Sequence, residues 1–365
     1  MIIHFILQFL TIISNASAEQ YIVTSKGVEI TGMTISSFSP ISDIFGMHLV
    51  DRESLIQNWR IISDMYEIEP DNPVTIKVQK SEPWHRQRIV KDTPVYNADP
   101  YPYREPGSCY MTASNVTIDT YIVDTGIDVT HPQFGGRATW LANFADKTQL
   151  DCQGHGTHVA GLVGSRDYGV CVDARLFAVK VLDCNGSGRL SGVIKGIDFV
   201  YRRHIKKKKT KSIINMSLGG GKSRALDNVV NRVVTGSSDF FVVVAAGNEN
   251  EDACQGSPSG AQHAFTVMAS DRSDKRAYFS NWGECCDIYS PGVDILSTIP
   301  GGTDVYSGTS MASPIVAGVV GMFISRYPNL ENYKLLETMY KQGTQNVIKG
   351  LYPGALIRLP SSPKP

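Results

Sequence analysis

The chain has 365 residues, a length that suits one large domain with or without a smaller one. Of these residues 42% are hydrophobic and 19% are charged, which excludes a wholly disordered chain and a long charged helix. The 35 basic and 35 acidic residues cancel, and this balance argues against nucleic acid as a partner. Seven cysteines are too few for a disulfide-dense small scaffold but allow up to three bridges.

Residues 1–18 predict a secretory signal peptide. The stretch 2–13 is mostly apolar, and Ala16, Ser17 and Ala18 form a small-x-small cleavage site. The apolar run is shorter than the ~20 residues of a membrane-spanning helix, and no later run predicts a span. A short signal anchor is the alternative. We therefore expect secretion to an extracellular or cell-surface location, where disulfides can form.

Residues 19–80 predict a small α+β unit. An apolar strand at 21–23 is followed by apolar residues at helical spacing between 55 and 62, and a second strand at 74–78 is expected to close the unit. About 60 residues is a marginal size for independent stability. The stretch 81–115 is rich in proline and tyrosine and predicts extended surface chain.

From about residue 119 onward, apolar strands alternate with amphipathic helices. Strands are predicted at 121–123, 176–179, 213–216 and 240–244. Helices are predicted around 193–200 and 226–233, and from Pro314 to Tyr327. This alternation predicts a three-layer α/β fold with a mostly parallel central sheet and helices on both faces.

A basic run at residues 206–209 interrupts this pattern. We interpret it as a solvated loop between a helix and the next strand. A docking patch for an anionic surface is the alternative.

Three glycine-flanked motifs carry an aspartate, a histidine and a serine. Asp124 ends a predicted buried strand, His155 lies where a helix begins, and Ser310 precedes a helix whose N-terminus favours negative charge. A serine hydroxyl needs a base within hydrogen-bond reach, and a histidine held by a buried carboxylate supplies it. The motifs are residues 123–128, 154–161 and 307–314.

With these motifs the chain resembles the subtilisin family of serine proteases (family S8), and within it the proteinase K and aqualysin branch. The resemblance runs from about Pro83 to the last helix. It implies that Ser310 is the nucleophile, His155 the base and Asp124 the orienting carboxylate. It also implies that Asn248 donates to the oxyanion together with the backbone N–H of Ser310.

The same resemblance implies two edges that bind the substrate. The first edge pairs with the peptide by strand addition. Neither edge, at 217–221 or 245–247, carries an acidic residue, so we expect broad specificity for apolar or aromatic side chains. A convertase that cuts after basic pairs is the alternative. The expected substrate-binding residues are Ser217, Leu218, Gly219, Ala245, Ala246 and Gly247.

Residues 19–80 resemble the inhibitory propeptide of this family, which packs on the catalytic domain and is removed by the enzyme itself. We place the cut near Lys80, so that 81–365 form the peptidase domain. The chain is therefore predicted to be a self-processed zymogen that acts on protein and peptide substrates as a monomer. A catalytically silent binding or surface protein with the same fold is the alternative, but all four catalytic residues are present.

The resemblance implies two disulfides, Cys152–Cys184 and Cys254–Cys285. The states of the other three cysteines stay open. These are Cys109, Cys171 and Cys286.

Asn115 and Asn185 lie in glycosylation sequons, and a third sequon at Asn215 falls on a predicted buried strand, where it should be shielded. No cofactor is required and no metal-ligating set is predicted. A structural calcium near Asp287 is a weaker expectation, because some relatives hold one there and calcium needs six or more oxygens.

Overall fold

The computed structural model describes most of the chain beyond residue 116 and parts of the chain before it. The predicted signal peptide, Asn115 and Cys109 lie outside the described residues. The described residues are 20–25, 39–42, 47–57, 66–71, 73–75, 84–89, 116–207, 209–351 and 358–359.

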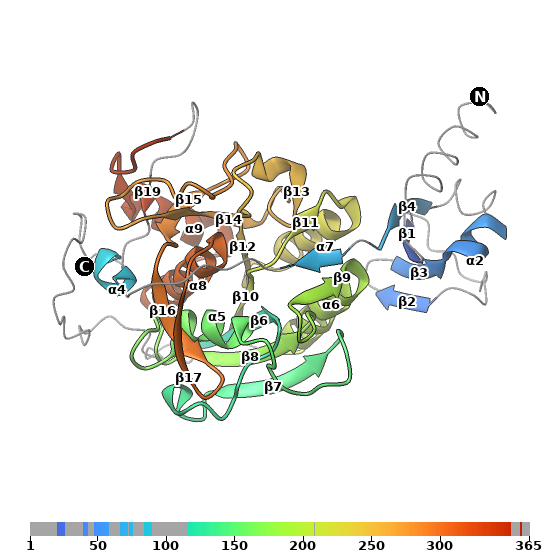
Figure 1. Cartoon of the computed structure of the whole chain (residues 1–365), viewed down its shortest axis with the longest axis horizontal. Helices are drawn as coiled ribbons and strands as arrows, with labels where there is room; N and C mark the ends of the chain where they lie inside the picture. Colours follow the sequence, from blue (N-terminus) through green and yellow to red (C-terminus); the bar gives the residue numbers. More distant parts are fainter. Residues whose placement is uncertain are drawn as a thin grey trace.

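A seven-stranded sheet forms the centre of the larger domain (Figure 1). Its order is β15-β14-β12-β10-β6-β8-β7, and every neighbouring pair is parallel. The predicted α/β fold with a parallel sheet is confirmed. The strands are β6 (Thr117–Asp124), β7 (Ala138–Asn143), β8 (Arg175–Lys180), β10 (Thr210–Met216), β12 (Phe240–Ala245), β14 (Phe265–Ser270) and β15 (Ile288–Pro291).

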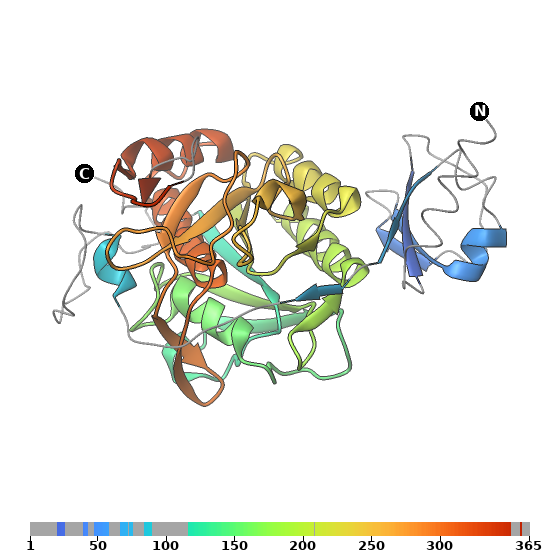
Figure 2. The same ribbon diagram turned by 45° about the horizontal axis from the view of Figure 1, so that its top comes forward.

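Helices cover both faces of this sheet, as Figures 1 and 2 show. Successive strand residues point to opposite faces: Ile122 packs in a core with α5, α8 and α9, whereas Tyr121 and Val123 pack with α6 and α7. Both faces are therefore buried, which explains the unbroken apolar runs in the strands. The helices are α5 (His155–Gly164), α6 (Leu190–Ile205), α7 (Arg224–Thr235), α8 (Thr309–Arg326) and α9 (Asn332–Gln342).

Shorter elements complete the larger domain. The hairpin of β16 and β17 lies beside α5, and β11 pairs antiparallel with β13. Their bounds are η1 (Pro132–Phe134), β9 (Ser187–Arg189), β11 (Gly220–Gly221), η2 (Ala253–Gln255), β13 (Gly256–Ser257), β16 (Ile295–Ile299), β17 (Gly302–Tyr306), β18 (Thr344–Gln345) and β19 (Arg358–Leu359).

Helix α8 begins five residues before the predicted start, so the expectation that Pro314 opens it was wrong. Pro314 lies inside the helix and has no N–H for the carbonyl of Ser310, four residues earlier. The Oγ–H of Ser217 donates to that carbonyl instead, at 2.8 Å. Because the freed carbonyl has a partner, the helix continues through the proline.

By length and composition, α8 is also the one helix of the described residues that could cross a membrane. Of its residues, 94% are buried inside the domain, as is typical of a core helix.

The N-terminal unit contains a four-stranded antiparallel sheet of order β2-β3-β1-β4, and it lies at one end of the molecule (Figure 1). The predicted strand at 21–23 lies in β1, but the sequence missed β4 (Tyr66–Pro70), which closes the sheet. The expected closing strand at 74–78 instead begins as β5 (Pro73–Thr75), which pairs with β9 of the larger domain. The remaining elements are β1 (Gln20–Ser25), β2 (Ser39–Ser42), β3 (Met47–Asp51), α2 (Arg52–Gln57) and α4 (His85–Arg88).

The structure contains the two disulfides that the resemblance implied, Cys152–Cys184 and Cys254–Cys285. Cys171 is also disulfide-bonded, to a partner outside the described residues. Cys286 is buried and has a free thiol, whose pKa burial raises.

Candidate active site

The fold brings Asp124 and His155 into direct contact. Asp124 is the last residue of β6, and His155 is the first residue of α5. The imidazole Nδ1 of His155 hydrogen-bonds to Oδ1 of Asp124 at 2.8 Å, and both side chains are fully buried. The other ring nitrogen, Nε2, has no hydrogen-bond partner among the described residues. The carboxylate therefore holds the ring so that Nε2 can accept a proton.

Ser310 is the second residue of α8, which packs against α5. Its Oγ–H donates to the backbone carbonyl of Ser217 at 3.1 Å rather than to His155. Hydrogen bonds between a nucleophile and its base are often unmade without substrate and tighten in the Michaelis complex. The Ser310 side chain is thus held at the end of β10, in the first turn of α8.

Asn248 follows the buried strand β12. Its Oδ1 accepts both the backbone N–H and the hydroxyl of Thr309, at 2.8 and 3.0 Å. Two donors at Oδ1 fix the orientation of the amide, and its Nδ2 makes no hydrogen bond to the described residues. The Nδ2 group is therefore available to donate to a ligand beside Ser310, which lines the same pocket.

This pocket has a volume of about 330 Å³. The two expected substrate-binding edges form its walls, and Asn248, Thr309 and Ser310 also line it. The six expected substrate-binding residues all contribute, namely Ser217, Leu218, Gly219, Ala245, Ala246 and Gly247.

Three carboxylates that the sequence argument did not consider also line the pocket: Glu249, Glu251 and Asp252. Glu249 accepts the N–H of Asn248 at 2.8 Å, and Asp252 accepts the N–H of Cys254 at 3.0 Å. The carboxylate of Glu251 is exposed and has no hydrogen bond or ion pair within the described part of the chain. The sequence signal for them is the acidic stretch directly after Asn248, which lies outside the two expected substrate-binding edges.

Comparison with known proteins identifies relatives that match most of the chain. A model of the subtilase family matches residues 114–351. The chain is 45% identical over 293 residues to the subtilisin-like serine protease Rho m 2.0101 of Rhodotorula mucilaginosa, covering 77% of this chain and 83% of that protein.

This chain belongs to the subtilase family.

A second relative of this subtilase is the subtilisin-like serine protease pepC of Aspergillus niger, 41% identical over 330 residues. That match covers 85% of this chain but only 60% of the relative's length. Among solved structures, a cold adapted subtilisin-like serine proteinase superposes with a TM-score of 0.69 at 35% identity, covering 78% of this chain and 100% of that one. The subtilisin-like fold is thereby confirmed.

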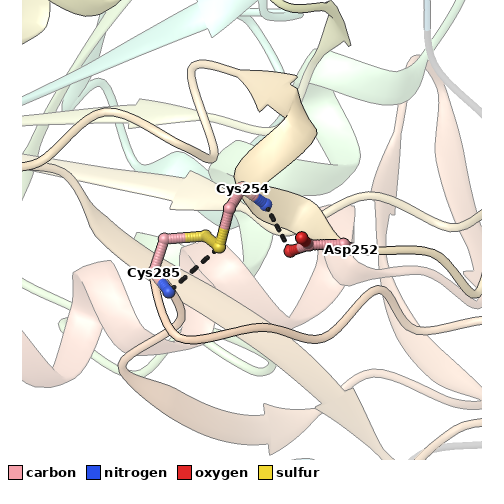
Figure 3. A group of neighbouring side chains, drawn as sticks. All are labelled: Asp252, Cys254 and Cys285. Carbon is pink, nitrogen blue, oxygen red and sulfur yellow. Dashed lines mark hydrogen bonds between the residues drawn. A yellow bond between two sulfur atoms is a disulfide. The ribbon is translucent and has the colours of Figure 1, made fainter.

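One group of three candidate metal ligands lies in the described part of this subtilase: Asp252, Cys254 and Cys285 (Figure 3). The two sulfurs are joined in a disulfide, so neither is a thiolate ligand. Oδ1 of Asp252 accepts the N–H of Cys254. The group is therefore a structural link beside the pocket rather than a metal centre.

Asp287, near which calcium was expected, belongs to no such group among the described residues. Its Oδ2 accepts the N–H of Thr266 at 2.7 Å, and burial raises its pKa to about 7. Calcium at this position stays a prediction.

The two described glycosylation sequons differ in exposure. Asn185 is exposed on the turn that leads to β9, whereas Asn215 is fully buried in β10. Oδ1 of Asn215 accepts the hydroxyl of Ser313 at 2.7 Å, so the structure shields it, as expected.

Proposed function

We propose that this subtilase is a serine endopeptidase that hydrolyses peptide bonds through an acyl-enzyme. The observation that carries the proposal is the buried Asp124–His155 hydrogen bond, which leaves Nε2 unpaired. Ser310 and the amide of Asn248 line one pocket, so that nucleophile and oxyanion donor reach the same bound carbonyl.

The chemistry follows from these positions. His155 takes the Oγ proton of Ser310 at Nε2 while Oγ attacks the scissile carbonyl. The Nδ2 group of Asn248 and the backbone N–H of Ser310 donate to the oxyanion that forms. His155 then gives its proton to the leaving amine, and a water molecule, activated in the same way, releases the acyl group.

The substrate preference follows from the pocket. Leu218, Ala245 and Ala246 give it apolar walls, which support the expected acceptance of apolar and aromatic side chains. The carboxylates of Glu249 and Glu251 extend the proposed specificity to basic side chains. The aliphatic stem of a lysine or arginine can lie along the apolar walls while its charged end pairs with these carboxylates. We therefore propose a broad specificity that includes basic residues before the scissile bond.

Several contacts support an inhibitory role for residues 19–80. Strand β5 pairs antiparallel with β9 and also packs against β11, beside the edge proposed to bind substrate. In Figures 1 and 2 this strand runs from the small unit toward the middle of the larger domain. These contacts support the proposal that the segment occupies the place of a substrate strand, as a propeptide that blocks its own enzyme would.

Two neighbouring carboxylates attach the small unit to the N-termini of two helices. Asp71 is buried and accepts the N–H and hydroxyl of Ser191, in the first turn of α6, at 2.7 and 2.6 Å. Glu69 accepts the hydroxyl of Ser223, the N-cap of α7, and the N–H of Ala225. Helix N-termini carry partial positive charge, so both carboxylates favour docking.

The contacts of Trp84 and Arg88 support the expected cut near Lys80. Trp84 donates from Nε1 to the carbonyl of Val293 at 2.8 Å, and Arg88 forms a buried ion pair with Asp274. Trp84 and Arg88 are therefore both anchored in the peptidase domain. We propose that 19–80 is the propeptide, 81–365 the peptidase domain and 1–18 a signal peptide that directs the zymogen to secretion.

Labelling with a fluorophosphonate probe tests the activity. We expect a covalent adduct with the wild type and none with Ser310→Ala. We also expect Ser310→Ala to accumulate as the uncut proenzyme while the wild type acquires a new N-terminus near Ser81. An unlabelled wild type would favour a silent binding or surface protein, which no contact described here supports. Normal processing of Ser310→Ala without another protease would exclude self-cleavage.

A further inference from the structure

A second buried carboxylate lies between the two elements that carry Asp124 and His155. Asp151 precedes α5 and is 3% exposed. Its Oδ1 accepts the hydroxyl of Thr125 at 2.8 Å and the N–H of Gly154 at 2.8 Å. It also accepts the N–H of Gln153, at 3.3 Å. The carboxylate thus accepts hydrogen bonds from two segments, the turn after β6 and the residues just before α5.

The other oxygen of Asp151 binds the first turn of α5. Oδ2 accepts both the N–H and the hydroxyl of Thr157, the N–H at 2.8 Å. The Thr157 hydroxyl in turn accepts the N–H of Asp128 at 2.8 Å, and the Thr125 hydroxyl accepts the N–H of Gly156 at 2.8 Å. Each threonine therefore links the chain after Asp124 to the helix that begins with His155.

The backbones of these two segments also touch. A Cβ added to Gly156 would lie 2.1 Å from the carbonyl oxygen of Gly126, which leaves no room for any side chain. Such an approach brings polar backbone groups together in a buried place, where each needs a partner. The carboxylate of Asp151 and the two threonine hydroxyls provide those partners.

A carboxylate suits this position better than an amide does. All five groups around Asp151 are donors, and they approach both of its oxygens. An asparagine would accept at one atom and would direct an NH₂ group at donors on the other side. The N-terminal dipole of α5 favours the negative charge.

We propose that Asp151 is a positioning residue of this peptidase, holding the Asp124 turn and the first turn of α5 at the separation that the Asp124–His155 hydrogen bond requires. The proposal rests on the proposed function, because it assigns Asp151 a role through His155. The Asp151 carboxylate is buried, and both of its oxygens are hydrogen-bonded within the domain, so it does not act by touching substrate. Its loss should therefore lower turnover and leave substrate binding nearly unchanged.

The first test is Asp151→Asn, made with a site for an added protease between Thr75 and Trp84 so that maturation does not depend on the variant's own activity. We expect kcat to fall roughly 10- to 100-fold, because small misplacements of catalytic groups cost about that much, with KM within about twofold. The matched control is Asp271→Asn. That carboxylate also accepts two backbone N–H groups, those of Ser273 and Lys275, but only within its own turn. It should keep full kcat.

A purely structural role would lower the melting temperature and leave a normal kcat per active site, counted by fluorophosphonate titration. That outcome would overturn the proposal. If Asp151→Asn does not fold, Thr125→Val is decisive. It removes the link from Asp151 to the Asp124 turn, together with the acceptor of the Gly156 N–H, but keeps the contacts of the Asp151 carboxylate itself to α5, and it should lower kcat by about 10-fold. A Thr125→Val enzyme with normal kcat would refute the proposal.

A double-mutant cycle shows whether Asp151 acts through His155. Without the imidazole there is nothing left to position, so Asp151→Asn should change the residual kcat of His155→Ala by less than about twofold. Equal fold-losses in both backgrounds would contradict the proposal. The proposed function is tested separately by the His155→Ala single variant, which should itself lose most activity whatever Asp151 does.

Discussion

Replacing Asn248 in two different ways separates its chemical role from its structural one. Oδ1 accepts two hydrogen bonds from the buried Thr309, whereas Nδ2 makes none to the described residues. Asn248→Ala removes both ends of the amide. Asn248→Asp keeps an oxygen for Thr309, replaces the donor with a second oxygen and adds a negative charge.

The size of each effect follows from these contacts. Loss of one oxyanion donor costs ~10² to 10³ in kcat, about 3 to 4 kcal/mol, a magnitude taken from subtilisin itself. Asn248→Ala also leaves the Thr309 N–H without an acceptor, at about 1 to 3 kcal/mol of unfolding free energy. At roughly 2 to 4 °C per kcal/mol, its melting temperature should fall by several degrees. Asn248→Asp should lose at least as much kcat, because its charge opposes the oxyanion, with a smaller change in melting temperature.

The assay measures kcat and KM on a chromogenic peptide, with active sites counted by titration. Melting temperatures are measured on the same variants in a Ser310→Ala background, because an active peptidase digests its own unfolded chain. Asn228→Asp, on the exposed face of α7, is the matched control and should match the wild type. An Asn248→Asp enzyme with near-normal kcat would refute the oxyanion assignment. If Asn248→Ala lowers the melting temperature but leaves kcat unchanged, Asn248 only caps a turn.

Three further predictions concern docking, specificity and pH. Asp71→Asn should weaken inhibition of the mature enzyme by the 19–80 unit about 10- to 100-fold, since it removes a charged acceptor from Ser191; an unchanged inhibition constant would contradict this. Glu251→Gln should lower kcat/KM several-fold for a lysine substrate relative to its methionine analogue, because an exposed charge pair contributes up to about 1 kcal/mol; an unchanged ratio would exclude a role in specificity. Asp287, with its pKa raised from 3.8 to about 7, contributes stability that is complete below pH 3.8 and lost as pH rises through about 7. The Asp287→Asn variant of inactive enzyme should therefore lose less melting temperature between pH 5 and pH 9 than its parent. If calcium binds at Asp287, adding calcium at pH 9 should raise the melting temperature of the parent but not that of Asp287→Asn.

Much of the fold could be predicted because each apolar run has a clear length and period. The four predicted strands of the larger domain fall within β6, β8, β10 and β12. The start of α8 could not be predicted, since a proline inside a helix is tolerated only when another group binds the freed carbonyl. Here that group is Ser217, 97 residues before Pro314 in the chain. The pairing of β5 could not be predicted for the same reason. Its β-branched sequence indicates a strand but does not show that the strand pairs with β9.

Periodicity and turn chemistry are local properties, so four strands of the central sheet and the three glycine-flanked motifs could be predicted from the amino-acid order. Which polar groups approach one another depends on how these elements pack. The hydroxyl of Thr125 reaches Asp151 from another segment, and the carboxylates of residues 249–252 line one pocket with the edge at 217–221; no spacing along the chain encodes either approach. Burial is the physical reason: once β6 and α5 pack together, every enclosed polar group must find a partner, and the folded backbone determines which groups lie within reach.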